Sequence, residues 1–446
     1  MNNPLVTIYI TSHNYEDYIA DAIESVLSQT YPNIELIIFD DNSSDNSPSV
    51  IKEFKDNDNV NVILSNKKNG LRKASNECIK SANGEYVLRL DADDILNENC
   101  ISNMIENIKR APLKPKFVFS NYFYMDSASE VLGVELIHRS NGEYHAHSIP
   151  PHGACCLISK DVFETYGYYN ETIKRQDGHE LWIKILKNKL PFSHIEIPLW
   201  YYRKHGESLS SDNELLYKDR KILKQNLNKS KDFAIAFIPI LESTFDVFNP
   251  IETGHLDRLV NEIRLSKKFK SIIISSDSKA VNDFCNNNNI QFHDRNDLIV
   301  AGKSDIFDSL KEIINSNIEF KDEIFCIVNL TSVNINKYHL QEIINTLQLY
   351  NSDSVISVYL ENGIMYKMDK FGLSPINYDS QFKIRKDRDF VYIFNGALRA
   401  LKGANIIKDK PFGQKIGHIE MSIRDSRLVK TKQQAARYIM NKNESD

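Results

Sequence analysis

Aspartates are concentrated at two points in the first hundred residues, each directly behind an apolar run. They are Asp40 and Asp41 behind the run 34–39, and Asp91, Asp93 and Asp94 behind the run 86–90. In an extended chain, residues i and i+2 point the same way, so Asp91 and Asp93 can face one ligand together. Mg²⁺ and Mn²⁺ prefer oxygen ligands and also bind phosphate oxygens. The pattern therefore predicts a site for a divalent cation.

Aspartate also forms turns and caps helices without binding any ligand. We interpret Asp45 in this way, because it lies in a polar turn, NSSDNS, outside both clusters. The five carboxylates behind two neighbouring strands favour a ligand site instead.

The elements that must position these carboxylates alternate along the chain. Apolar runs typical of strands cover 5–10, 34–39, 60–64 and 86–90, and residues 15–29 and 72–81 have the spacing of amphipathic helices. Strands that alternate with helices predict a parallel sheet covered on both faces. Ligands bind at the carboxyl ends of such strands, so we expect the chemistry just past Ile10, Phe39 and Leu90.

A second α/β unit is predicted in the other half of the chain. The pattern is mixed over 117–204, and the polar segment 208–231 is interpreted as a solvated helix. Strand-like runs then restart at Phe233 and recur at 271–275, 324–330 and 354–359. The chain of 446 residues allows two or three domains, and we expect two, residues 1–228 and 229–446.

Composition excludes several classes of protein. Hydrophobic residues make up 41% and charged residues 26%, as in soluble globular proteins. A net charge of −5 argues against a dedicated nucleic-acid binder. Apolar stretches such as 233–241 are shorter than the roughly 20 residues of a membrane span, and we expect no signal peptide. Six scattered cysteines predict buried, reduced thiols in a cytoplasmic protein.

Ordered motifs over residues 4–210 resemble the family 2 glycosyltransferases, which have the GT-A fold. The motifs are TIYITSHNYEDYIADAIESVLSQTYPNIELIIFDDNSSDNS, NGLRKASNECIKSANGEYVLRLDADD, QDGHELWIKIL and YYRKHGESLS. Their order and spacing make the resemblance far more specific than a lone Asp-x-Asp.

The resemblance implies roles for individual residues. Thr11, Asp41 and Asp91 would bind the donor nucleotide, with Asp41 at the edge of the base. Asp93 and Asp94, in the Asp-x-Asp motif and its extension, would hold the metal, and His205 would lie near the donor phosphates as a further ligand.

Two more residues take roles from the resemblance. Asp177 matches the aspartate that usually serves as general base, although Gln176 replaces the glutamate before it, and His152 lies where the family often contacts the acceptor. Simpler interpretations stay open: Asp177 as a helix-capping carboxylate, and His205 as a surface residue. For the aromatic residues 200–202, packing is favoured over an acceptor platform.

The chemistry implied is sugar transfer. A bound Mn²⁺ or Mg²⁺ would stabilise the leaving diphosphate, and a single carboxylate base implies direct displacement with inversion. The implied donor is a nucleotide sugar, with UDP favoured, and the implied acceptor is a glycan or lipid-linked glycan. Bacterial capsule or lipopolysaccharide assembly is the expected setting. Peripheral association with the inner face of the membrane and a homo-oligomer through the second domain are left open.

Residues 233–440 resemble, more weakly, the cytidylyltransferases that make CMP-sialic acids. The matching segments are FAIAFIP, KSIIISSDSKAV, VNLTSVNI, SDSVISVY, VYIFNGALRAL and MSIRDSRLVKTKQQAARYI. The phosphate-binding loop is replaced by Ile240–Thr244 with Glu242 inside it, and Leu428 and Lys430 stand where the family has metal-binding aspartates. We therefore expect a nucleotidyltransferase-like fold without activity. A bifunctional enzyme that also activates a sugar, and a non-catalytic scaffold or sensor, are the alternatives.

Overall fold

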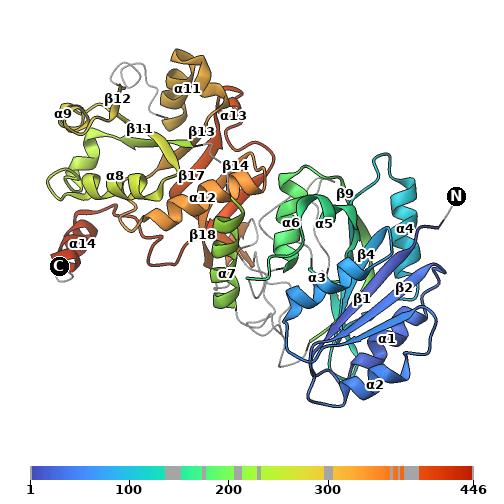
Figure 1. Ribbon diagram of the computed structural model, residues 1–446. Coiled ribbons are helices and arrows are strands. Elements are labelled where there is room, and N and C mark those ends of the chain that lie inside the picture. Colours follow the sequence, from blue (N-terminus) through green and yellow to red (C-terminus); the bar gives the residue numbers. More distant parts are fainter. Residues whose placement is uncertain are drawn as a thin grey trace. The chain divides into compact units, whose positions relative to one another are not determined.

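The computed structural model describes residues 3–135, 152–172, 177–204, 213–228, 233–295, 305–361, 365–369, 372–375 and 391–443. The chain divides into two compact units (Figure 1). Unit 1 comprises residues 1–144 and 149–223, and the chain enters unit 2 at Lys224.

Unit 1 has strands and helices in alternation over its first hundred residues. Its strands are β1 (Val6–Ser12), β2 (Ile34–Asp40), β3 (Val60–Leu64), β4 (Tyr86–Asp91), β5 (Ile95–Leu96), β6 (Phe117–Met125), β7 (Val131–Glu135), β8 (Leu157–Ser159) and β9 (Phe192–Arg203). Its helices are α1 (Ile19–Leu27), α2 (Ser47–Glu53), α3 (Leu71–Ser81), α4 (Cys100–Arg110), α5 (Asp161–Tyr166) and α6 (Asp177–Lys187), followed by α7 (Asn213–Leu227), which reaches into unit 2.

These strands form one sheet in the order β3-β2-β1-β4-β8-β6-β9-β5, with β7 paired to β6. The first four strands in this order are parallel, as the alternating pattern predicts. The mixed pattern of the following residues corresponds to a mixed part of the sheet, in which β8 is antiparallel to both β4 and β6 and β9 is parallel to β6. The predicted α/β class with a sheet covered on both faces is confirmed (Figure 1).

Alternate residues of β1 serve the two faces of this sheet. Val6, Ile8 and Ile10 join a core of fully buried side chains with α1, α2 and α4. The other face lies under α3. The helix expected over 15–29 begins only at Ile19. The backbone N–H groups of Tyr15 and Glu16 instead donate to the side chains of Ser47 and Asp45, which ties this turn to the loop after β2.

Unit 2 is a second α/β unit. Its strands are β10 (Ala234–Ile240), β11 (Phe269–Ser276), β12 (Gln291–Asp294), β13 (Ile324–Val328), β14 (Ser354–Glu361), β15 (Tyr366–Asp369), β16 (Gly372–Pro375), β17 (Val391–Lys402) and β18 (Ile416–Glu420). Its helices are α8 (His255–Ser266), α9 (Lys279–Asn288), α11 (Ile306–Ser316), α12 (Lys337–Leu349), α13 (Gly403–Ile407) and α14 (Lys432–Asn443), with short 3₁₀ helices η1 (Glu242–Asp246) and η2 (Ile318–Asp322).

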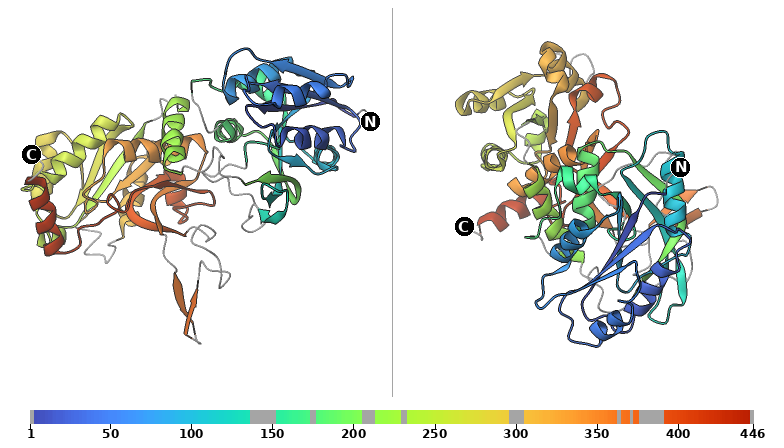
Figure 2. Two further views of the ribbon diagram at one scale, coloured as in Figure 1. Left: turned by 90° about the horizontal axis from the view of Figure 1, so that it is seen from below. Right: turned by 45° about the vertical axis from the view of Figure 1, so that its right-hand side comes forward.

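Seven of these strands form a sheet in the order β12-β11-β10-β13-β17-β14-β18. Only β17 runs antiparallel to its two neighbours within this described sheet. One face is covered by α8, α9 and α12 and the other by α11 and α13, each over its own apolar core. The ribbon β15–β16 projects away from the seven-stranded sheet of the same unit (Figure 2).

The polar helix expected near the middle of the chain is not solvated at its end. Lys224 in α7 is buried, with its Nζ 3.4 Å from Glu342 Oε1 and 3.1 Å from Thr346 Oγ1 on α12. Asn228 Nδ2 donates to Asn345 Oδ1 over 2.6 Å. A polar sequence was misleading here because the helix buries polar groups against partners that satisfy them.

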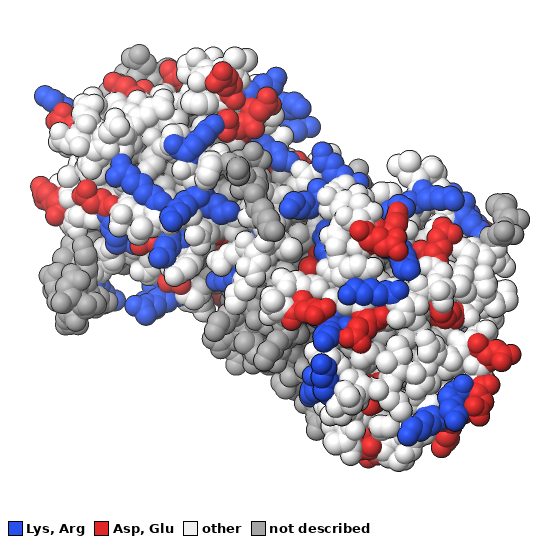
Figure 3. All heavy atoms as spheres, in the orientation of Figure 1, with Lys and Arg blue, Asp and Glu red and all other residues white. Residues whose placement is uncertain are grey.

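Surface charge and cysteine burial agree with the composition. All six cysteines are buried, and none of them forms a disulfide, as expected. Basic and acidic side chains are interspersed over the visible faces of both units (Figure 3). In the described part of the chain, none of the helices combines the length and the apolarity that a bilayer crossing requires.

Candidate active site

Strand register brings three of the predicted residues to one edge of unit 1. Thr11 on β1 pairs with Asp91 on β4. On the other side of β1, Ser12 pairs with Asp40, and the N–H of Asp41 donates to the Ser12 carbonyl over 2.8 Å. Thr11, Asp41 and Asp91 therefore lie on adjacent chain segments at the carboxyl ends of three parallel strands, where such sheets bind ligands.

Asp41 holds the loop that leads into α3. Its buried carboxylate accepts the backbone N–H of Asn69 over 2.6 Å and of Gly70 over 2.7 Å. Gly70 has φ of +86°, a conformation that suits glycine. Oδ1 also accepts from Asn69 Nδ2 over 3.2 Å, whereas Oδ2 accepts from Gly70, so the second lone pair of Oδ2 leaves acceptor capacity toward a ligand.

A histidine that the sequence analysis did not single out sits beside Asp41. Lys68 Nζ lies 2.7 Å from His13 Nε2, and His13 Nδ1 lies 3.0 Å from the Asp41 carbonyl oxygen. Because lysine only donates, Nε2 is the acceptor and Nδ1 carries the proton that reaches the carbonyl. His13 directly follows the end of β1 at Ser12, and this position at a strand end could have indicated it.

The acidic residues behind β4 form a tight turn. The N–H of Asp94 donates to the Asp91 carbonyl over 3.1 Å. Asp91 Oδ1 lies 2.9 Å from Arg89 Nε, and Asp94 Oδ1 accepts the backbone N–H of Arg203 over 3.0 Å. These contacts hold the backbone of the turn and the side chains of Asp91 and Asp94 in place.

Burial and mutual repulsion dominate the electrostatics of the turn. Burial, followed by the charges of Asp93 and Asp91, raises the pKa of Asp94 well above its ordinary value. Burial and the same carboxylates also raise the pKa of the neighbouring Tyr15, so its phenol keeps its proton. An arrangement in which carboxylates penalise one another gains from a nearby cation.

The oxygen donors of this turn are of the type that a divalent cation prefers. Across the described ranges, no three His, Cys, Asp or Glu side chains are arranged to hold a metal by themselves. Asp94 Oδ2, however, is buried with no hydrogen-bond partner among those residues. Mg²⁺ is commonly held by one or two carboxylates, with substrate phosphates and water completing its shell. The turn fits a cation that arrives with a phosphorylated substrate.

Helix α6 begins beside the segment that contains His152. A Cβ at Gly178 would lie 2.5 Å from the Cα of Gly153, so the two backbones touch. The N–H of Cys155, three residues after His152, donates to the Arg89 carbonyl on β4 over 2.7 Å. The structure therefore brings the backbone of the α6 start and the 152–155 segment next to β4. Asp177 is the first residue of α6, and its side chain is outside the described part.

His152 is packed among aromatic rings. Its ring centroid lies 4.9 Å from that of Tyr202, 5.1 Å from Trp200 and 5.8 Å from Tyr122. Trp200 is 1% exposed, which agrees with packing as its main role. His205, the other predicted histidine, lies outside the described residues.

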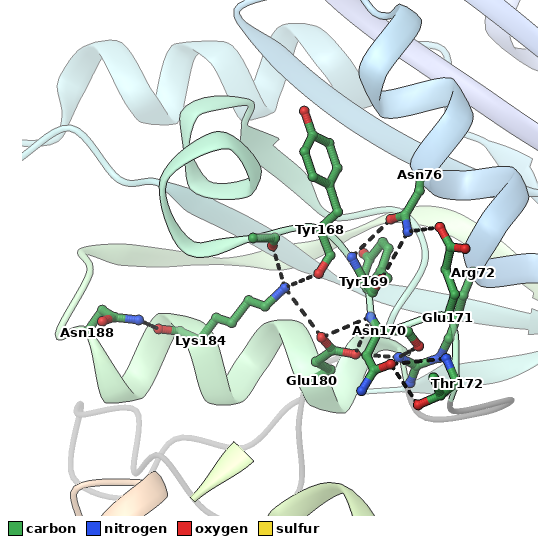
Figure 4. Close-up of polar contacts among 11 residues, drawn as sticks. Arg72, Asn76, Tyr168, Tyr169, Asn170, Glu171, Thr172, Glu180, Lys184 and Asn188 are labelled. Atoms are coloured by element: carbon green, nitrogen blue, oxygen red, sulfur yellow. Dashed lines mark hydrogen bonds and ion pairs between the residues drawn. The ribbon is translucent and has the colours of Figure 1, made fainter. Parts of the chain in front are cut away.

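Buried polar contacts fix α6 against α3 (Figure 4). Arg72 on α3 forms an ion pair with Glu180 on α6, and both side chains are buried. Glu180 also accepts the N–H of Asn170, and Lys184 Nζ donates to the carbonyls of Gly167 and Tyr168 over 2.5 and 2.8 Å. Burial lowers the pKa of Lys184. We call Arg72, Glu180 and Lys184 the α6 clamp.

Sequence reasoning missed the α6 clamp and Arg203, although all four lie inside or beside the motifs quoted above. A signal was present: Glu180 and Lys184 stand on a helix whose neighbours Leu181, Trp182 and Ile185 are core residues. Charges next to a buried face need partners, and the sequence does not say which partners they find.

Two family models match the chain. The glycosyl transferase family 2 model matches residues 7–167, and the cytidylyltransferase model matches residues 256–395. Both resemblances identified from the motifs are confirmed.

Named relatives match the first half. The Escherichia coli protein named UDP-Glc:alpha-D-GlcNAc-diphosphoundecaprenol beta-1,3-glucosyltransferase WfaP is 32% identical over 221 residues, 49% of this chain and 86% of that protein. Streptococcus pneumoniae glycosyltransferase GlyG is 28% identical over 255 residues, 53% of this chain and 83% of that protein. An uncharacterized Rickettsia typhi glycosyltransferase is 32% identical over 193 residues. The match covers 42% of this chain and 59% of the Rickettsia protein.

Among solved structures, residues 1–349 of S. aureus TarS in complex with UDP-GlcNAc superpose with a TM-score of 0.41 at 16% identity. The match covers 59% of this chain and 79% of that one.

Glu180→Gln should lower the free energy of unfolding of unit 1 by about 3–5 kcal/mol. The substitution leaves the buried charges of Arg72 and Lys184 without their carboxylate partner. Glu106→Gln is the matched control, since Glu106 pairs with Arg110 on the surface and should cost at most about 0.5 kcal/mol. Urea unfolding followed by fluorescence measures both. Equal, small losses in the two variants would show that the α6 clamp does not hold the helix.

Proposed function

Because this chain belongs to the family 2 glycosyltransferases, we propose that unit 1 transfers a sugar from a nucleotide-sugar donor to a hydroxyl of a glycan or lipid-linked glycan. The observation that carries the proposal is the meeting of Thr11, Asp41 and the Asp91–Asp94 turn at one sheet edge, with the start of α6 docked beside it.

The division of labour follows from position. Thr11 and Asp41 end β1 and follow β2, so we assign them to the nucleoside, with the free acceptor capacity of Asp41 turned to the base. Asp91 and Asp93 face the diphosphate. Asp93, Asp94 and His205 would hold a cation there. The cation, when bound, would neutralise the charge that develops on the leaving diphosphate.

The acceptor is activated from the side of α6. Asp177 is the first residue of an 11-residue helix, a position where the helix dipole favours a charged carboxylate. We propose that Asp177 takes the proton of the acceptor hydroxyl as its oxygen attacks the anomeric carbon. The bond to the diphosphate breaks in the same step, which inverts the configuration. His152, in the segment that touches the α6 start, would contact the acceptor.

Donor and setting are taken from the relatives. WfaP is named for UDP-Glc and a diphosphoundecaprenol acceptor. We therefore propose a UDP-sugar donor and bacterial surface polysaccharide assembly, such as capsule or lipopolysaccharide. A lipid-linked acceptor would bring the protein from the cytoplasm to the inner face of the membrane.

For unit 2 we propose a catalytically inactive cytidylyltransferase-like domain, covering 229–446, that serves binding or oligomerisation. At the end of β10, where a triphosphate would need backbone donors, the N–H of Glu242 already donates to Asp277 Oδ1 over 2.8 Å. Two carboxylates there repel phosphates. Leu428 Cδ1 lies 4.0 Å from the position a Cβ would take at Gly396, so an apolar side chain occupies a place assigned to a metal ligand.

EDTA should abolish sugar transfer from UDP-glucose, and Mn²⁺ should restore it. Asp93→Asn should lower kcat at least about 100-fold, the loss typical when one group that stabilises transition-state charge is removed. Asp58→Asn, on an exposed loop of the same unit, is the control and should keep full turnover. Transfer that is indifferent to chelation contradicts the metal role. The assay follows UDP release with an undecaprenyl-diphosphate-linked GlcNAc acceptor.

Asp177→Asn separates catalysis from helix capping. Asparagine caps helices as well as aspartate does, so a capping role predicts unchanged transfer. As general base, Asp177 predicts that kcat falls about 100- to 10,000-fold while UDP affinity, measured by calorimetry, stays the same. Unchanged kcat would point to another base.

Unit 2 should not make CMP-sugars. The full chain incubated with CTP, Mg²⁺ and N-acetylneuraminic acid should release no pyrophosphate above the buffer blank. CTP-dependent pyrophosphate release that matches CMP-sugar formation would favour the bifunctional alternative.

A further inference from the structure

We propose that Arg203 is the positioning residue of the acidic turn: its guanidinium fixes the backbone of Asp93 and so sets the direction from which the Asp91–Asp94 carboxylates meet the cation and donor diphosphate. This inference rests on the proposed function of that turn. Arg203 is the last residue of β9 and is 1% exposed, which makes it one of two arginines among the largest fully buried side chains of the described chain.

Arg203 holds the acidic turn at two consecutive residues. Its side-chain Nε donates to the Asp93 carbonyl over 2.8 Å. Its backbone N–H donates to Asp94 Oδ1 over 3.0 Å. The backbone contact exists with any residue at 203 except proline, whereas the contact to Asp93 needs the side chain. Substitution of the side chain therefore isolates the hold on Asp93.

The other end of the guanidinium is anchored away from the turn. Nη1 donates to the carbonyls of Asp126 and Ser127 over 3.2 and 3.3 Å and to Ser129 Oγ over 2.8 Å, all in the turn between β6 and β7. Nη2 lies 3.5 Å from Asp21 Oδ2 on α1, and the guanidinium carbon lies 4.6 Å from the centre of the Tyr18 ring. The acidic turn, the β6–β7 turn and the start of α1 thus orient one planar guanidinium.

Arginine is required for this geometry. A guanidinium presents five donors in a rigid plane, so it can span the Asp93 carbonyl and the β6–β7 turn at once. A lysine would keep the charge but present its donors from a single point. A mere packing role would not need donors on both edges of the group.

The test measures Mn²⁺ affinity in the presence of UDP by calorimetry on the full chain, without relying on turnover. Arg203→Lys should weaken Mn²⁺ affinity about 10- to 100-fold, the usual effect of removing an outer-shell partner of a metal ligand. KM for the donor should rise, while KM for the acceptor stays unchanged. Arg295→Lys changes a fully buried arginine of unit 2 and is the matched control. It should leave the Mn²⁺ affinity and the donor KM unchanged.

A merely structural role would reduce the folded fraction and hence the number of Mn²⁺ sites, but not their affinity. Wild-type affinity in Arg203→Lys therefore overturns the inference. If this variant does not fold, Ser129→Ala removes one exposed anchor of the guanidinium and should weaken Mn²⁺ binding in the same direction; unchanged binding there overturns the inference as well. Absence of Mn²⁺ binding in the wild type would refute the metal role itself, and with it this inference.

Discussion

Three carboxylates within four residues, at the end of a buried strand, repel one another, and unit 1 is built around that constraint. Asp94 is fully buried, and burial together with Asp93 and Asp91 raises its pKa. The repulsion is tolerated because the turn is tied from both sides. Arg89 pairs with Asp91 from within β4, and Arg203 reaches across from β9 to Asp93 and Asp94. Under the proposed function, a cation held at this turn would relieve the same repulsion.

The remaining parts of the site are attached to this turn by backbone contacts. Parallel register sets Thr11 beside Asp91, and Asp41 gathers the Asn69–Gly70 loop through two N–H groups. The segment after His152 joins β4 at Arg89, and α6 touches that segment at Gly178. The α6 clamp then fixes this helix against α3. Positioning is thus achieved largely by groups that need not contact the substrate.

Site residues whose position follows from the neighbouring stretch of sequence could be predicted. The strand ends before Asp41 and Asp91 follow from apolar runs, and their order gives the parallel sheet. Arg203 and the Arg72–Glu180 pair could not be predicted, because their partners are more than 100 residues away and many surface charges look the same in a sequence. The end of α7 was wrongly expected in solvent, since Lys224 and Asn228 find buried partners on α12. The site side chains of Asp177 and His205, which lie outside the described residues, stay predictions.

The cytidylyltransferase family model matches unit 2 over residues 256–395, and Glu242, Asp277 and Leu428 support the proposal that this unit is inactive. The proposed catalysis therefore rests on the acidic turn of unit 1. The most direct measurement is a crystal structure of the full chain with UDP and Mn²⁺. The account predicts anomalous density for Mn²⁺ between the diphosphate and the Asp93 carboxylate, with the Asp93 carbonyl still bound by Arg203 and the uracil edge at Asp41. Mn²⁺ or UDP bound away from the Asp91–Asp94 turn would contradict it.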